Sequence, residues 1–171
     1  MSLLPPGPAA PWPIRAFGSL VDWTIVAIGS AMIVLVFLNV LFHLMGGDIA
    51  WTTELCELLM VWVTFLGGAA AARRGAHMTI TEFLDKLDSK GRRLADGAIQ
   101  LLCLGILAML VWFGAGIVQS TWSNELTVLH VPMGLQYLAL PVGAGAMAVF
   151  TGWDLLQIVL GRTRDQRYGT A

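Results

Sequence analysis

Two carboxylates and three histidines are the side chains of this sequence that could carry chemistry within apolar surroundings. Glu54 and Glu57 stand at the start of a long apolar run, and their i, i+3 spacing predicts that they share one face of a helix. Carboxylates inside a membrane span usually mark a functional contact or pathway. We therefore expect both acids to bond to groups on a neighbouring helix or on a partner subunit.

A plainer interpretation of the two acids stays open. Both belong to the first turns of the predicted helix, near the lipid headgroups and the positive end of the helix dipole, where a carboxylate is tolerated. Continuing their face gives the small stripe Val61, Thr64, Gly68 and Ala71, whereas the opposite face carries Leu55, Leu59, Trp62 and Leu66. Small stripes favour close helix contact in lipid, so we expect the bulky face to meet a partner or lipid.

The histidines could ligate a metal or haem. A b-type haem needs one axial ligand on each side of its ring. His43 and His130 could form that pair, although one ends a predicted span and the other lies in a loop. We interpret His77 as a hydrogen-bonding residue at a chain elbow rather than as a proton relay. Without a metal-ligand motif, a phosphate-binding loop or a nucleophile elbow, the sequence predicts neither an enzyme nor a cofactor.

Composition places these residues in an integral membrane protein. The 171 residues are 57% hydrophobic and 12% charged, with a mean hydropathy of +0.73, whereas soluble domains carry about 25% charged residues. Cys56 and Cys103 fall within apolar runs and form no CxxC motif, so we interpret them as small buried hydrophobes. The predicted fold class is all-α.

Hydropathy predicts four transmembrane helices, at about 20–44, 52–72, 95–118 and 133–160. The second would be about 31 Å long, which matches the hydrocarbon core of a bilayer. The domain organisation is a proline-rich tail (1–18), a membrane domain (19–160) and a second tail (161–171). Pro141 interrupts the last span and predicts a kink, and Gly67 and Gly143 add further small packing surfaces. Interface anchors are expected at Trp23, Trp51, Trp122 and Trp153.

Charge asymmetry predicts the orientation. Four spans put both termini and the middle loop on one side, and that side holds all ten Lys and Arg residues. The positive-inside rule then places both termini in the cytoplasm. Arg73 and Arg74 would close the second span and meet lipid phosphates or carboxylates. A short amphipathic surface helix is expected at about 79–88, with an ordinary solvated loop as the alternative.

The middles of the spans lack polar groups, so the chain alone is not expected to conduct ions or transport solutes. Broken, inverted helix repeats, which are typical of secondary transporters, are also absent from the sequence. The basic residues are those that topology and anionic lipid require, so nucleic-acid binding is not indicated. These features favour an accessory or scaffold role.

The sequence resembles a known family, the small membrane subunit (DctQ-like, Q type) of tripartite ATP-independent periplasmic (TRAP) transporters. The resemblance rests on the order Trp51, Glu54, Glu57, Trp62, Gly67, Arg73, Arg74, His77 and on the passage VPMGLQYLALPVG. It covers residues 17–160 and leaves out the proline-rich tail. No single motif carries it; the combination with length, four spans and charge bias does.

The resemblance implies a multi-pass protein of the bacterial inner membrane, in contact with membrane lipids. Its partners would be a large multi-span TRAP membrane subunit (M type) and a periplasmic solute-binding receptor (P type). The small subunit would brace the large one, which carries the substrate and sodium sites for uptake of an organic acid. The alternative is a membrane anchor subunit of a redox complex that binds haem or quinone.

Overall fold

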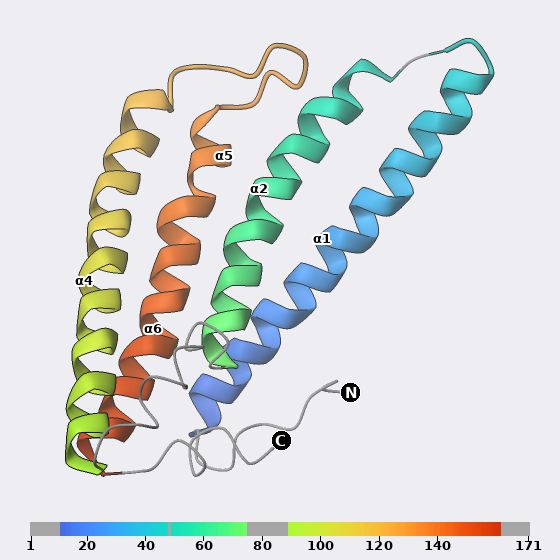
Figure 1. Ribbon diagram of the computed structural model, residues 1–171. Helices are drawn as coiled ribbons and strands as arrows, with labels where there is room; N and C mark the ends of the chain where they lie inside the picture. The colour runs from blue at the N-terminus through green and yellow to red at the C-terminus, as the bar shows by residue number, and fades with distance from the viewer. Residues whose placement is uncertain (1–10, 48, 75–88, 162–171) are drawn as a thin grey trace.

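The computed structural model describes residues 11–47, 49–74 and 89–161. Its helices, labelled in Figure 1, are α1 (Trp12–Leu44), α2 (Ala50–Arg73), α4 (Ser89–Thr121), α5 (Gly134–Tyr137) and α6 (Ala139–Val159). Within these residues the only strand-like feature is one isolated bridge between Glu125 and Pro132. Four segments are long and apolar enough to cross a membrane. The all-α, four-span fold class is confirmed, and the predicted surface helix lies outside the described residues.

The span boundaries differ from those predicted at two helix starts. α1 begins at Trp12 rather than at residue 20, so the irregular tail ends earlier than expected. A proline occupies its first turn, where its fixed φ fits a helix and its missing N–H costs no hydrogen bond. α4 begins at Ser89 rather than at residue 95. Both helices have 33 residues, about 50 Å, so they extend beyond the hydrocarbon core.

The last span is interrupted where its proline removes a hydrogen bond. α5 and α6 are separated by Leu138, whose own N–H still donates to the carbonyl of Gly134 at 2.8 Å. Pro141 has no N–H to donate to the carbonyl of Tyr137, four residues earlier. The interruption therefore falls one turn before the proline.

The long helices form a row rather than a closed bundle. α1 packs on α2, α2 also packs on α6, and α6 packs on α4, which gives the order seen in Figure 1. Each helix in such a row leaves large apolar side chains uncovered, among them Phe37 (62% exposed) and Trp112 (78% exposed). We call the end with the α1–α2 turn and the α4–α5 loop the loop end. The opposite end, where α2 finishes at Arg73, is the arginine end.

The core lies between α1, α2 and α6, towards the arginine end. It consists of Val21, Leu66, Ala69, Ala70, Ala146 and Phe150. Phe17 on α1 reaches across to Phe150 on α6, with ring centroids 5.4 Å apart. The alanines matter because, in lipid, close backbone approach supplies the packing that holds helices together.

Glycines set the distance between α2 and α6. A Cβ added at Gly143 would lie 2.5 Å from the Cβ of Phe65 and 3.1 Å from its backbone. A Cβ at Gly68 would lie 2.2 Å from Cε of Met147, but that atom is the end of a flexible side chain. Gly67 has open space around its missing Cβ, and Ala71 is half-buried. Among these glycines, Gly143 therefore leaves the least freedom for a side chain.

We predict that Gly143→Ala destabilises the chain, because the new methyl group forces α6 away from the backbone of α2. The expected loss is about 1–3 kcal/mol in the free energy of unfolding, measured by denaturant or thermal unfolding in detergent. Gly145→Ala is the matched control, since nothing lies within 4 Å of the Cβ it would add. Both changes gain the same helix propensity, so equal stability of the two variants would contradict the prediction.

Candidate functional site

Glu54 joins α2 to the α4–α5 loop at the loop end. The backbone N–H of Val128 donates to Oε1 at 3.1 Å and to Oε2 at 2.9 Å, and that of Leu129 donates to Oε2 at 2.9 Å. The contact explains how a carboxylate is accommodated there, because its negative charge accepts bonds from backbone groups 74 and 75 residues away.

The loop that Glu54 binds is itself ordered by backbone hydrogen bonds. The N–H of Leu126 donates to the carbonyl of Val131 at 2.9 Å, and that of Met133 donates to the carbonyl of Asn124 at 2.7 Å. Nearby, the indole N–H of Trp62 donates to the carbonyl of Leu135 at 3.1 Å. Two side chains of α2 thus hold the region that leads into the last span.

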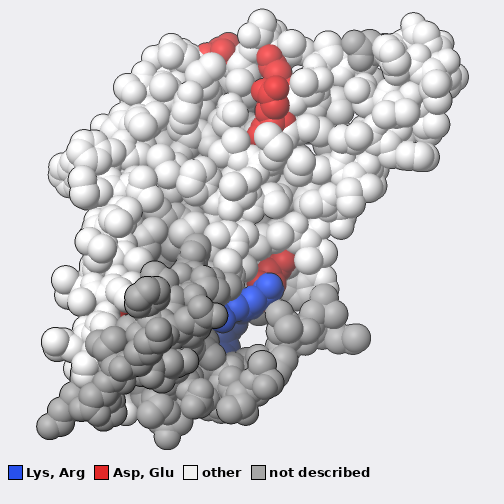
Figure 2. All heavy atoms as spheres, in the orientation of Figure 1, with Lys and Arg blue, Asp and Glu red and all other residues white. Residues whose placement is uncertain are grey.

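Glu57 has a different environment, although it is only one turn from Glu54. It is exposed, and together with Asn39 and Thr53 it lines a groove of about 300 Å³ between α1 and α2. Figure 2 shows acidic side chains towards the loop end of this face and another acidic side chain beside the basic ones at the opposite end. The visible Lys and Arg side chains of the described residues lie at the opposite end of the same face. The two acids therefore do not act as one site.

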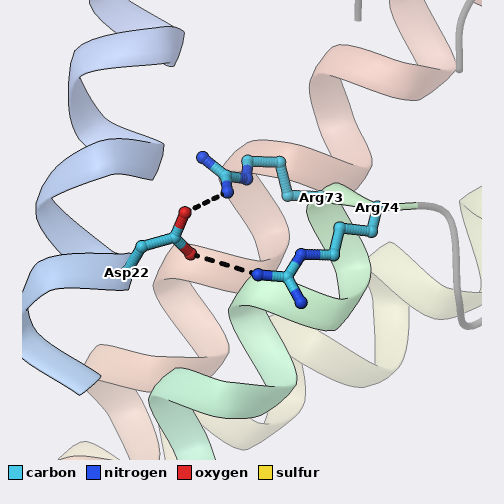
Figure 3. A network of polar contacts seen from close by, with 3 residues as sticks. All are labelled: Asp22, Arg73 and Arg74. Carbon is cyan, nitrogen blue, oxygen red and sulfur yellow. Dashed lines mark hydrogen bonds and ion pairs between the residues drawn. The ribbon is translucent and has the colours of Figure 1, made fainter. Parts of the chain in front are cut away.

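The arginine end holds an ion-pair cluster between α1 and α2, shown in Figure 3. Nη2 of Arg73 donates to Oδ2 of Asp22, and Nη2 of Arg74 lies 3.7 Å from Oδ1 of the same carboxylate. Asp22 is the partner that the sequence left unassigned for the two arginines. Arg73 also crosses Gly18, where an added Cβ would meet its guanidinium at 2.1 Å. The Arg73 side chain thus needs a glycine on α1 to reach the aspartate.

A buried polar contact joins α4 to α6, and sequence reasoning did not find it. Nε2 of Gln100 donates to Oδ2 of Asp154, and both side chains are buried. Two further polar residues are buried on the same helices. Asp96 lies four residues before Gln100 on α4, and Gln157 lies three residues after Asp154 on α6. The signal was the spacing of these pairs, which puts each pair on one helix face. Gln100 and Gln157 were overlooked because they carry no charge.

The remaining predicted site residues are dispersed. His77 lies outside the described residues. Among the predicted anchors, Trp23, Trp51 and Trp122 are exposed and Trp153 is half-buried. Trp122 also packs on Gly134, where an added Cβ would lie 2.7 Å from its ring.

The prediction about the two faces of α2 is wrong in the middle of the helix. Leu66 is buried and Trp62 packs against the core, whereas Thr64 on the small face is exposed. The residues that allow close approach, Ala69 and Ala70, lie beside Leu66 rather than opposite it. Leu66 and Trp62 therefore pack inward and Thr64 faces outwards, whereas Gly68 of the small stripe still contacts Met147 on α6.

The two histidines considered for haem are both exposed. His43 is in the last turn of α1, and His130 is in the α4–α5 loop with φ at 51°. Across residues 11–47, 49–74 and 89–161, no group of three His, Cys, Asp or Glu side chains is arranged to hold a metal ion.

Comparison with known proteins identifies the family to which this chain belongs. The profile of the DctQ component of tripartite ATP-independent periplasmic transporters matches residues 32–161. The chain belongs to this family of small permease subunits. It is therefore a transport component rather than an enzyme, and a multi-pass protein of the bacterial inner membrane. The comparisons do not support the redox-anchor alternative.

Individual relatives agree with that family. The chain is 35% identical to the C4-dicarboxylate TRAP transporter small permease protein DctQ of Rhodobacter capsulatus over 129 residues, 71% of this chain and 52% of the relative. It is 30% identical to the sialic acid TRAP transporter small permease protein SiaQ of Vibrio cholerae over 115 residues, 65% of this chain and 66% of the relative. It is 27% identical to the ectoine TRAP transporter small permease protein TeaB of Halomonas elongata over 112 residues, 63% of this chain and 58% of the relative. The chain thus spans about half the length of the first of these relatives.

We predict that Glu54→Gln loosens the α4–α5 loop, because one neutral oxygen replaces a carboxylate that accepts from two backbone amides. Hydrogen bonds to a charged group contribute about 1.5–3 kcal/mol, so amide exchange at Val128 and Leu129 should accelerate by about tenfold or more. Hydrogen exchange with mass spectrometry on the isolated subunit measures this. Glu57→Gln is the control and should leave the loop unchanged; equal exchange in both variants would argue against the role of Glu54.

Proposed function

We propose that this chain is the scaffold subunit of a sodium-coupled TRAP transporter and braces a large, multi-span transport subunit while that subunit moves. The observation that carries the proposal is the row of helices, which leaves broad apolar faces uncovered. A large membrane partner can cover such a face without entering the row. The ion pair at the arginine end and the Gln100–Asp154 contact favour fixed packing within the row over sliding.

The substrate we propose is an organic acid. The relatives are named for C4-dicarboxylate, sialic acid and ectoine, all of which carry a carboxylate. The spans of this chain offer no continuous polar lining in the part that the structure describes, since their polar side chains lie towards the helix ends. Substrate and sodium would therefore bind to the large subunit, and specificity would not be encoded here.

We propose that the loop end helps to dock the periplasmic receptor. The α4–α5 loop is ordered by its own hydrogen bonds and by Glu54, so it presents a defined surface. Glu125 is exposed on that loop. Its charge would favour a basic or polar patch on the receptor.

The orientation proposed here puts the loop end in the periplasm and both termini in the cytoplasm. In a background with Cys56 and Cys103 replaced by Ala, Gly47→Cys and Ser123→Cys should react with a membrane-impermeant thiol reagent from outside. Ser89→Cys should react only after the membrane is permeabilised. Labelling in the reverse pattern would overturn the orientation.

Reconstitution tests the scaffold function directly. The receptor is first matched to the organic acid that raises its melting temperature, and uptake of that radiolabelled acid is then measured in proteoliposomes. With receptor and a sodium gradient present, this chain alone should take up nothing, because its spans contain no polar pathway. Uptake should appear when the large subunit is added. Uptake by this chain alone would refute the proposal.

A further inference from the structure

The loop-end half of α1 diverges from α2, as Figure 1 shows. Between Met32 and Leu44, α1 has no buried residue, whereas Gly18 and Val21 in its other half are buried against the neighbouring helices. The groove of about 300 Å³ lies between the loop-end halves of α1 and α2. Its walls include Val36 and Val40 on α1. The ion pair between Asp22 and Arg73 holds the two helices together at the end away from the groove.

Two hydrogen-bond acceptors line this groove without a donor among the described residues. The carboxylate of Glu57 is exposed, and Oδ1 of Asn39 is inaccessible to solvent yet accepts no bond within that part of the chain. Glu57 lies about 10 Å from the first residue of α2, and Asn39 about 7 Å from the end of α1, at 1.5 Å per residue. Hydrocarbon offers no donor, so an acceptor that lies within it and stays unpaired is costly.

The outward face of α2 beside the groove fits another helix better than an acyl chain. It carries Thr53, Glu57, Met60 and Thr64, all exposed, followed by Gly67, whose missing Cβ faces open space. Small residues allow a second backbone to approach closely, and methionine adapts to the surface it meets. A lipid tail would place CH₂ groups against a carboxylate. A helix can place a donor there.

We propose that the groove between α1 and α2 receives a transmembrane helix of the large transport subunit, and that a basic side chain of this helix pairs with Glu57. Charge complementarity argues for a lysine or arginine, because the Glu57 carboxylate is exposed in the groove and supplies a negative charge that accepts hydrogen bonds. The inference rests on the function proposed above and adds to it the docking face and the chemistry of the partner.

The test uses this chain co-expressed with the large transport subunit of the same transporter. A photoreactive benzoylphenylalanine is introduced at Val36 or Met60 in the groove, the membranes are irradiated, and the crosslinked partner is identified by mass spectrometry. Both positions should crosslink to the large subunit, within a span that contains a lysine or arginine. Crosslinks to lipid alone, or to a span without a basic residue, would overturn the inference.

Substitution of Glu57 gives a second, independent measurement. Glu57→Leu should reduce the yield of the co-purified complex by about tenfold or more, because a buried basic group would lose its counter-charge. Glu57→Asp should retain most of the complex, and Glu125→Gln, on the loop surface, should leave it unchanged. The unfolding midpoint of the isolated Glu57→Leu variant should be no lower than that of the wild type, which separates assembly from folding. A Glu57→Leu complex at wild-type yield would refute the pairing.

The same experiments separate this inference from the function on which it rests. If the wild-type chain co-purifies with the large subunit but the groove does not crosslink to it, the docking face is wrong and the scaffold function stands. If the wild-type chain does not co-purify at all, the scaffold function itself fails.

Discussion

The absence of water in the hydrocarbon core is the constraint on which this structure depends. A polar group there must find its partner within the protein, because lipid tails neither donate nor accept hydrogen bonds. Towards the helix ends, where the core gives way to the interface, Glu54 binds backbone amides of the α4–α5 loop, Arg73 binds Asp22, and Gln100 binds Asp154. Each of these contacts joins segments far apart in the sequence. They connect α2 to the start of the last span, α1 to α2, and α4 to α6, so they determine which helices are neighbours and at what height.

Packing then brings the same helices into a row. Lipid gives no hydrophobic drive for helices to associate, so their contacts depend on how closely the backbones approach. Ala69 and Ala70 provide this in the core, and Gly143 provides it against Phe65. α2 thus has a close neighbour on each side, α1 and α6. A row exposes more surface than a bundle of the same helices, which is unfavourable in water but costs little in lipid. It also keeps a wide face available for a membrane partner.

The sequence predicted the number of spans and their approximate positions, because hydropathy depends only on local composition. For the same reason, counting Lys and Arg residues showed that they all fall on one side of the predicted spans. It also identified Glu54, Arg73 and Pro141 as residues of interest. It did not predict that Arg73 pairs with Asp22. The two residues are 51 positions apart, and their pairing depends on the register of α1 on α2. The error about the faces of α2 has a related cause. Helical spacing shows which residues share a face, but in a membrane both faces are apolar, so the pattern does not reveal which one turns inward.

Polar groups without a partner among the described residues distinguish the groove between α1 and α2. Within the described residues, Glu54, Arg73 and Gln100 find partners inside the chain, and each of these contacts stabilises the row itself. Glu57 and Asn39 differ, because they line one groove between α1 and α2 and find no donor in that part of the structure. Retaining a carboxylate there would destabilise an isolated subunit compared with an apolar side chain. The cost is offset only in an assembly that supplies the donor. A scaffold subunit that is completed by its partner in this way cannot dock in an arbitrary orientation, and fixed docking is what a brace for a moving transport domain requires.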